Sequence, residues 1–103
     1  MMNPFDMLKN AQGLQEQLER MQAELAAATE TGSSGGGIVR VTVNGQFEMV
    51  GIELDPVAVD PRDIQMLQDL IIAAHANACE KIRELIKTRM GPLASGLNIP
   101  GLG

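Results

Sequence analysis

The stretch that most constrains the fold is the pair of apolar runs on either side of Asn44 and Gly45. The run IVRVTV before them is β-branched at five of its six positions and alternates between two faces, which indicates a strand. Asparagine and glycine both tolerate the positive φ of a tight turn. Pro56 ends the return run, because proline has no amide to donate to a neighbouring strand. The sequence therefore predicts an antiparallel hairpin with strands at about residues 37–43 and 47–54.

The number of residues in the hairpin loop decides which side chains share a face. An even loop places the apolar residues of both strands together, whereas an odd loop separates them. These residues are Val39, Val41 and Val43 in the first strand, and Val50, Ile52 and Leu54 in the second. We expect an even loop. A two-residue turn would pair Val41 with Glu48, and a four-residue turn, which we favour because it buries more, would pair Val41 with Val50.

The size of the chain makes association with a second copy an expectation. A single domain of 103 residues, 1–103, is only marginally able to bury a core as a monomer. The sequence has no tryptophan or tyrosine, and its only aromatic residues are Phe5 and Phe47. The core must therefore be built from Leu, Ile, Val, Met and Ala.

Charge and cysteine content exclude several classes of protein. The net charge of −5 argues against broad attraction to phosphate, so nucleic-acid binding would require the few cations to be segregated on one surface. The single cysteine, Cys79, rules out a disulfide within the chain. We find neither a leader pattern at the N-terminus nor an apolar run long enough to cross a bilayer, and we expect a cytoplasmic protein without membrane contact.

A long helix is predicted near the N-terminus, at about residues 4–28. Pro4 suits its first turn, and Gly13 is a weak point that costs about 1 kcal/mol relative to alanine. Its apolar positions repeat in steps of three and four along a narrow seam, which is typical of packing against one partner. That partner is either the rest of the same chain or a second copy, and the period does not distinguish them. The candidates for a dimer interface here are Leu14, Leu18 and Met21.

The glycine- and serine-rich segment 29–37 (TETGSSGGG) has two interpretations. It could be a flexible linker. Alternatively, residues 29–34 alternate and could form a short edge strand, with the three glycines turning the chain into the next strand. A third strand would produce an antiparallel meander, which is more stable than a lone hairpin.

A second helix is predicted at about residues 61–90. Asp60 is expected to cap it, Pro61 to occupy its first position, and Gly91 and Pro92 to stop it. Its apolar residues cover a broad face that must meet more than one neighbour, and its alanines permit close approach. The dimer-interface candidates on this helix are Leu67, Ile71, Ala74 and Ala78. The tail at 91–103 is expected to be flexible unless it docks on a partner subunit.

Residues capable of catalysis are few and have simpler explanations. His75 is the only histidine, and it has no second imidazole or activated nucleophile within reach in the sequence. Cys79 lies one turn further along, but two ligands do not make a structural zinc site. We therefore expect a buried thiol and no catalytic residue, metal or cofactor.

Cations gather near the end of the second predicted helix, where Lys81, Arg83, Lys87 and Arg89 are separated by Glu80 and Glu84. One interpretation is a solvated face whose charges also complement the helix C-terminus. The other is that a dimer brings two such clusters together to contact a phosphate backbone. The candidates for DNA binding are these four residues together with Lys9 and Arg20 of the first helix.

Three pieces of sequence resemble a known family. They are VTVNG, the I-x-L-D-P exit from the hairpin, and DLIIAAHANA in the second helix. Together with the heptad helix MLKNAQGLQEQLERMQAEL and the ending NIPGLG, they are similar, in order, to the small bacterial nucleoid-associated proteins of the YbaB/EbfC type.

The resemblance implies an α+β fold of order α-β-β-β-α, in which two long helices flank a small antiparallel three-stranded meander. It also implies a homodimer with projecting helices, arranged like tweezers, that binds double-stranded DNA in the nucleoid with little or relaxed sequence preference. It implies no enzymatic activity and no small-molecule substrate. The rival hypothesis is a dimeric protein-interaction module, in which the glutamine-rich helix and the apolar tail recruit another protein.

Overall fold

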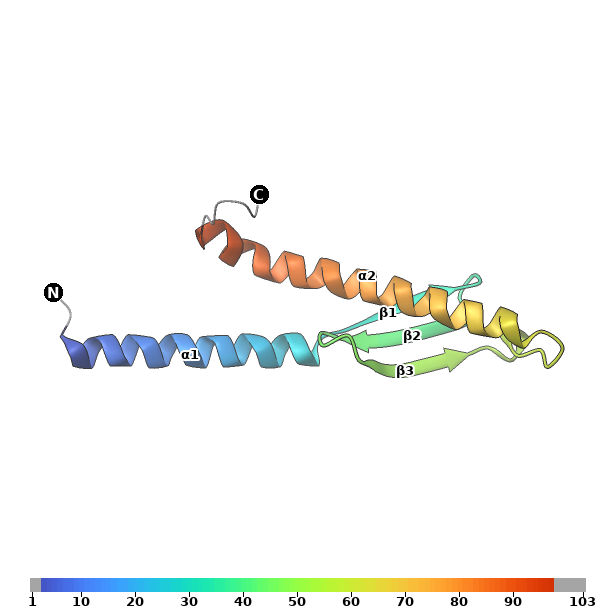
Figure 1. Cartoon of the computed structure of the whole chain (residues 1–103), viewed down its shortest axis with the longest axis horizontal. Helices are drawn as coiled ribbons and strands as arrows, with labels where there is room; N and C mark the ends of the chain where they lie inside the picture. The colour runs from blue at the N-terminus through green and yellow to red at the C-terminus, as the bar shows by residue number, and fades with distance from the viewer. Residues whose placement is uncertain (1–2, 98–103) are drawn as a thin grey trace.

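The computed structural model describes residues 3–97, with side chains described up to Gly91. Its elements are α1 (Pro4–Ala27), β1 (Thr29–Ser34), β2 (Val39–Asn44), β3 (Met49–Leu54), a short 3₁₀ turn (Pro56–Ala58) and α2 (Ile64–Leu97). The expected order α-β-β-β-α is confirmed. The molecule is elongated, measuring 73 × 26 × 16 Å, because α2 lies along the sheet whereas α1 leaves the end of the sheet (Figure 1).

The sheet is an antiparallel meander with strand order β1-β2-β3. The glycine-rich segment forms an edge strand rather than a linker, and Ser34 pairs with Val39 across the turn. The turn requires glycine at 35, 36 and 37, because all three residues have positive φ, between 60° and 99°.

The second hairpin confirms the shared face but not the expected pairing. Val41 pairs directly with Ile52, and Val39 with Leu54, so these side chains lie on one face. The two partners considered for Val41, Glu48 or Val50, are both wrong. The expected even loop is wrong as well, because Val43 pairs with Met49 and an odd number of residues, 44–48, lies between them. The loop closes later than expected, because the Asn44 N–H donates to the Glu48 carbonyl (3.0 Å), and an irregularity after Thr42 shifts the register.

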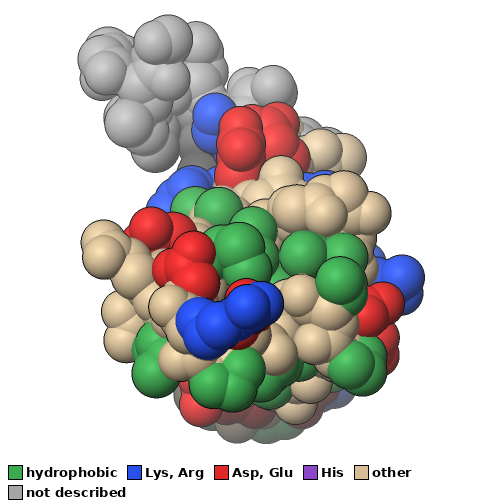
Figure 2. Space-filling model, turned by 90° about the vertical axis from the view of Figure 1, so that its right-hand side faces the viewer, with side chains coloured by type: hydrophobic (Ala, Val, Ile, Leu, Met, Phe, Trp, Pro, Cys, Tyr) green, Lys and Arg blue, Asp and Glu red, His purple; other side chains and the backbone are tan. Residues whose placement is uncertain are grey.

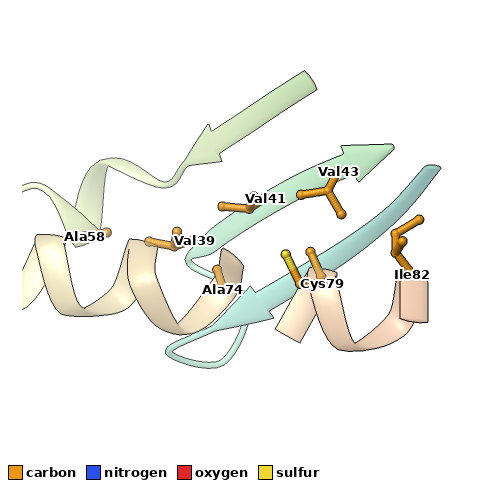
Figure 3. Packing of buried hydrophobic residues seen from close by; sticks show 8 residues of the cluster. Val39, Val41, Val43, Ala58, Ala74, Cys79 and Ile82 are labelled. Atoms are coloured by element: carbon orange, nitrogen blue, oxygen red, sulfur yellow. The ribbon is translucent and has the colours of Figure 1, made fainter. Parts of the chain in front are cut away.

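The core lies between β2 and α2. Val39, Val41 and Val43 are fully buried and pack with Ala74, Cys79 and Ile82 of α2, with Ala58 at one end (Figure 3). Ala78 belongs to the same buried cluster. β1 also approaches α2 closely: a Cβ on Gly32 would collide with the backbone of Ala74 and Ala78. The close approach expected of the alanines is therefore made within the chain. The assignment of Ala74 and Ala78 to a dimer interface is wrong, because neither has any exposed surface.

The start of α2 differs from the prediction. Asp63, not Asp60, caps the helix, since its Oδ1 accepts from the Met66 N–H (3.0 Å), and the helix begins at Ile64 rather than at residue 61. Asp60 is occupied by a local turn: its carboxylate accepts from the Arg62 guanidinium and from the Arg62 N–H. These hydrogen bonds hold the pKa of Asp60 below its usual value.

The end of α2 also differs. The helix continues through Gly91 and Pro92 to Leu97, so the stop expected at residue 90 is wrong and 91–97 is not an irregular tail. A proline inside a helix removes one backbone hydrogen bond, and α2 nevertheless continues past it. The expectation for the remaining tail falls on 98–103, outside the described residues.

Candidate nucleic-acid interface

α1 is a projecting helix that the rest of the chain does not cover. Asn3 caps it, accepting from the Asp6 N–H at 2.8 Å, yet the helix has no buried residue. Leu14 and Leu18 of the apolar seam are 62% and 55% exposed. The described part of the same chain therefore does not cover the seam.

The helix α2 becomes a second projection beyond the sheet. Leu85 and Ile86 still pack against the core, and the helix then continues past the same end of the sheet from which α1 leaves (Figure 1). We call α1 and residues 87–97 of α2 the two arms. The arms carry four of the six cations predicted to contact DNA, namely Lys9, Arg20, Lys87 and Arg89.

The remaining two candidates lie on opposite flanks of α2. Lys81 donates from Nζ to the Thr31 carbonyl of β1 at 3.0 Å. Arg83 lies over the ring of Phe47, in the loop between β2 and β3. Because β1 and β3 are the two edges of the sheet, these sequence neighbours do not converge on one surface.

The flank beside Lys81 is mainly acidic. A shallow groove there is lined by Glu30, Glu80 and Glu84 together with Lys81. Glu84 also lies 3.9 Å from the ammonium of Lys87, in an exposed pair that contributes little to stability. Carboxylates in these positions repel phosphate, so this flank is a weaker candidate for a DNA contact than residues 87–97 of α2, which include Lys87 and Arg89 and no acidic residue.

The far end of the molecule has no basic face in the view of Figure 2, where basic and acidic side chains lie side by side among hydrophobic ones. Arg62 is paired there with Asp60, at 3.1 Å between Nε and Oδ1. Val57, Val59 and Ile64 are exposed near the start of α2. We therefore locate the candidate interface at the arms.

His75 lies beside Cys79, one turn further along α2. The residue Cys79 is 6% exposed, and its Sγ lies 3.5 Å from His75 Nε2. Within residues 3–97, no cluster of three or more His, Cys, Asp or Glu residues could hold a metal ion. Over the same residues, no helix is both long and apolar enough to cross a membrane.

Sequence reasoning missed Phe47. This residue is the one non-glycine with positive φ (62°) in the described chain, although the sequence pointed to Gly45 for that role. Gly45 is needed for another reason: a Cβ there would collide with the Leu25 carbonyl at the end of α1. The only available signal was an aromatic residue in an otherwise polar loop.

Comparison with known proteins gives a consistent result. The model of the family described as the YbaB/EbfC DNA-binding family matches residues 1–97. A nucleoid-associated protein from Mycobacteroides abscessus is 50% identical over 94% of this chain and 85% of its own length. Another, from Syntrophobacter fumaroxidans, is 47% identical over 95% and 89%. The crystal structure of the uncharacterized protein HP0035 from Helicobacter pylori matches with a TM-score of 0.70, covering 90% of this chain and 98% of that one; at 20% identity it supports the fold alone.

Proposed function

The chain belongs to the YbaB/EbfC DNA-binding family, and we propose that it works in the bacterial cytoplasm, in the nucleoid, as a homodimer that binds duplex DNA without catalysing a reaction. In this proposal the arms contact phosphates, and sequence preference is weak. The observation that carries it is the position of four cations on two helices that project from one end of the sheet (Figure 1).

The proposal of a homodimer is supported by apolar surface that the chain leaves exposed. The seam of α1 is uncovered, and so are Ile52 and Leu54, which share a face with the buried valines but lie beyond the strands that α2 covers. A second copy of the chain can cover such surfaces. The apolar area buried in this way would add to the small core of a single chain. Leu14, Leu18 and Met21, with the half-buried Leu67 and Ile71, remain the proposed interface residues.

The proposal of phosphate contacts is supported by the chemistry of the arms. Lysine and arginine on exposed helices reach the DNA backbone without needing a groove, and a cation that contacts phosphate carries no direct sequence information. A dimer doubles the number of arms, and with it the number of cations that act on one duplex. Within the arms, residues 87–97 carry Lys87 and Arg89 and no acidic residue, whereas α1 carries Lys9 and Arg20 beside four carboxylates, so the end of α2 is the cation-rich part.

The test is the salt dependence of duplex binding. We expect Lys9→Gln, Arg20→Gln, Lys87→Gln and Arg89→Gln in one chain to weaken binding about equally for unrelated duplexes. The slope of log affinity against log salt should fall by about 0.9 for each phosphate that the variant no longer neutralises. Glutamine keeps helix propensity, so the variant should remain folded. Arg62→Gln, at the far end beside Asp60, is the matched control and should leave the slope unchanged.

Three outcomes would contradict the proposal. A variant that binds as the parent does, with the same slope, would place the phosphate-binding cations elsewhere, with Lys81, Arg83 and Arg40 as the next residues to replace. A folded mass near 11 kDa by sedimentation equilibrium at micromolar concentration would exclude the homodimer. If the parent binds no duplex near physiological salt, the protein-interaction hypothesis replaces this one.

A further inference from the structure

Phe47 has a backbone conformation that its three-residue loop calls for but that an aromatic residue rarely adopts. Its φ of 62° lies in the left-handed region, which suits glycine or asparagine and disfavours an aromatic side chain. Burial does not compensate, because the residue is 41% exposed and is not part of the core cluster. A strained residue that keeps its side chain on the surface is a candidate for a binding role.

Hydrogen bonds hold the loop backbone that carries the ring. Asn44 Oδ1 accepts from the N–H of Gln46 (2.9 Å) and of Glu48 (3.0 Å). The Phe47 N–H itself donates to the Asn44 carbonyl at 2.9 Å. The ring is thus carried by a hydrogen-bonded loop and not by a freely moving one, so little ordering is needed when a ligand contacts it.

A cation lies beside the ring. The guanidinium carbon of Arg83 is 5.7 Å from the ring centroid, within the range of a cation–π contact. The loop joins β2 to β3 at the end of the sheet from which the arms project (Figure 1). The aromatic ring and a cation therefore meet at the base of the arms, next to the proposed path of the DNA backbone.

We infer that Phe47 and Arg83 form a site for an unpaired nucleobase and its neighbouring phosphate. The exposed ring stacks on the face of the base, and the guanidinium contacts the phosphate. Every base has such a face, so the site does not read sequence; it distinguishes unpaired from paired bases, because a base inside a duplex is already stacked between its neighbours. This inference rests on the proposed function and adds a preference for locally opened or bulged DNA.

The experiment compares two fluorescent DNAs of equal length, one a matched duplex and one with a single-base bulge, by anisotropy. We expect the parent to bind the bulged DNA about five- to a hundredfold more tightly, the effect of stacking one base. Phe47→Asn should lose this preference while the salt slope stays the same. Asparagine accepts positive φ, so this variant should be at least as stable as the parent, and misfolding cannot imitate the result.

Two further variants complete the test. Phe47→Tyr keeps the ring and should keep the preference. Phe5→Leu removes the other phenylalanine, which also has a cation nearby (Lys9, 5.4 Å) but lies on a helix near the tip of α1; it should keep the preference as well. Equal affinity of the parent for both DNAs, or a preference that survives Phe47→Asn, would overturn the inference even if duplex binding is normal. Absence of binding to the matched duplex alone would instead overturn the proposed duplex function.

Discussion

The two long helices of this chain have opposite relations to the sheet. The inner face of α2 is buried against β1 and β2, with Ala74, Ala78 and Ile82 fully inaccessible to solvent. In α1 no residue is buried, although its apolar seam is as regular as any in the chain. Amphipathic periodicity therefore shows that a helix has a partner, but it does not show which chain supplies it.

This contrast predicts that mutations will act on two separate quantities. Changes under α2 should alter the free energy of unfolding of the single chain. Changes along the α1 seam should alter the free energy of association. The following substitutions test that separation, in order of decreasing expected effect.

The largest effect is expected for Gly32→Ala. The added Cβ would collide with the backbone of α2, which cannot move aside as a flexible side chain could. We expect a loss of about 3 kcal/mol or more in the free energy of unfolding, measured by urea denaturation. Gly51→Ala is the control in the same sheet, because its Cβ would lie 3.7 Å from the Cβ of Thr42, at ordinary contact distance. Equal destabilisation of both variants would show that the collision with α2 is not what destabilises the Gly32→Ala chain.

A smaller effect, on association, is expected for Leu18→Ala. If a second copy buries this side chain, its truncation should cost about 2 kcal/mol of binding free energy and raise the dimer dissociation constant roughly thirtyfold. Sedimentation equilibrium over a range of concentrations measures it. Gln17→Ala, on the polar flank, should leave the constant unchanged. An unchanged constant for Leu18→Ala would remove the seam from the interface.

Gly45→Val tests the junction between the two regions. Its side chain would collide with the Leu25 carbonyl, where the end of α1 meets the second hairpin. We expect a loss of about 1–2 kcal/mol, seen as a thermal midpoint lower by several degrees. An unchanged midpoint would mean that α1 shifts freely on the hairpin, and that its direction is not set by this contact.

The smallest effect, of opposite sign, is expected for Gly13→Ala. Apart from its chain neighbours and the nearby backbone of α1, no atom lies within 4 Å of the added Cβ, and the residue is exposed. Alanine should stabilise the helix by up to about 1 kcal/mol. Circular dichroism should show a more heat-resistant helix, whereas the urea midpoint of a Gly13→Ala chain should change little if the core unfolds independently of α1.

The sequence predicted those parts of the fold that local chemistry determines. Alternating valines identified β2 and their shared face, and the three glycines permitted the turn that makes β1 an edge strand. The loop of the second hairpin could not be predicted, because the hydrogen bonds of one side chain, Asn44, moved the closing pair to Glu48. Likewise, two acidic residues near the start of α2 could each cap it, and only the turn around Asp60 decides in favour of Asp63.

The candidate site was less predictable than the fold. Charge placement selected Lys81 and Arg83 together, yet residues two apart on a helix point to different sides, and these two contact opposite edges of the sheet. Phe47 was not selected, since the strain that distinguishes it exists only in the folded chain.

The position of Cys79 allows opening of the core to be measured by chemical labelling of a native side chain. The thiol is the only one in the sequence and lies in the buried cluster between β2 and α2. Because Cys79 is only 6% exposed, an alkylating reagent should react with it mainly when that unit opens, so the labelling rate reports the opening free energy of the sheet and α2. The rate should not respond to fraying of α1, which shares no buried contact with the thiol. Thiol labelling in the presence and absence of DNA would therefore report whether ligand binding at the arms changes the opening free energy of the core.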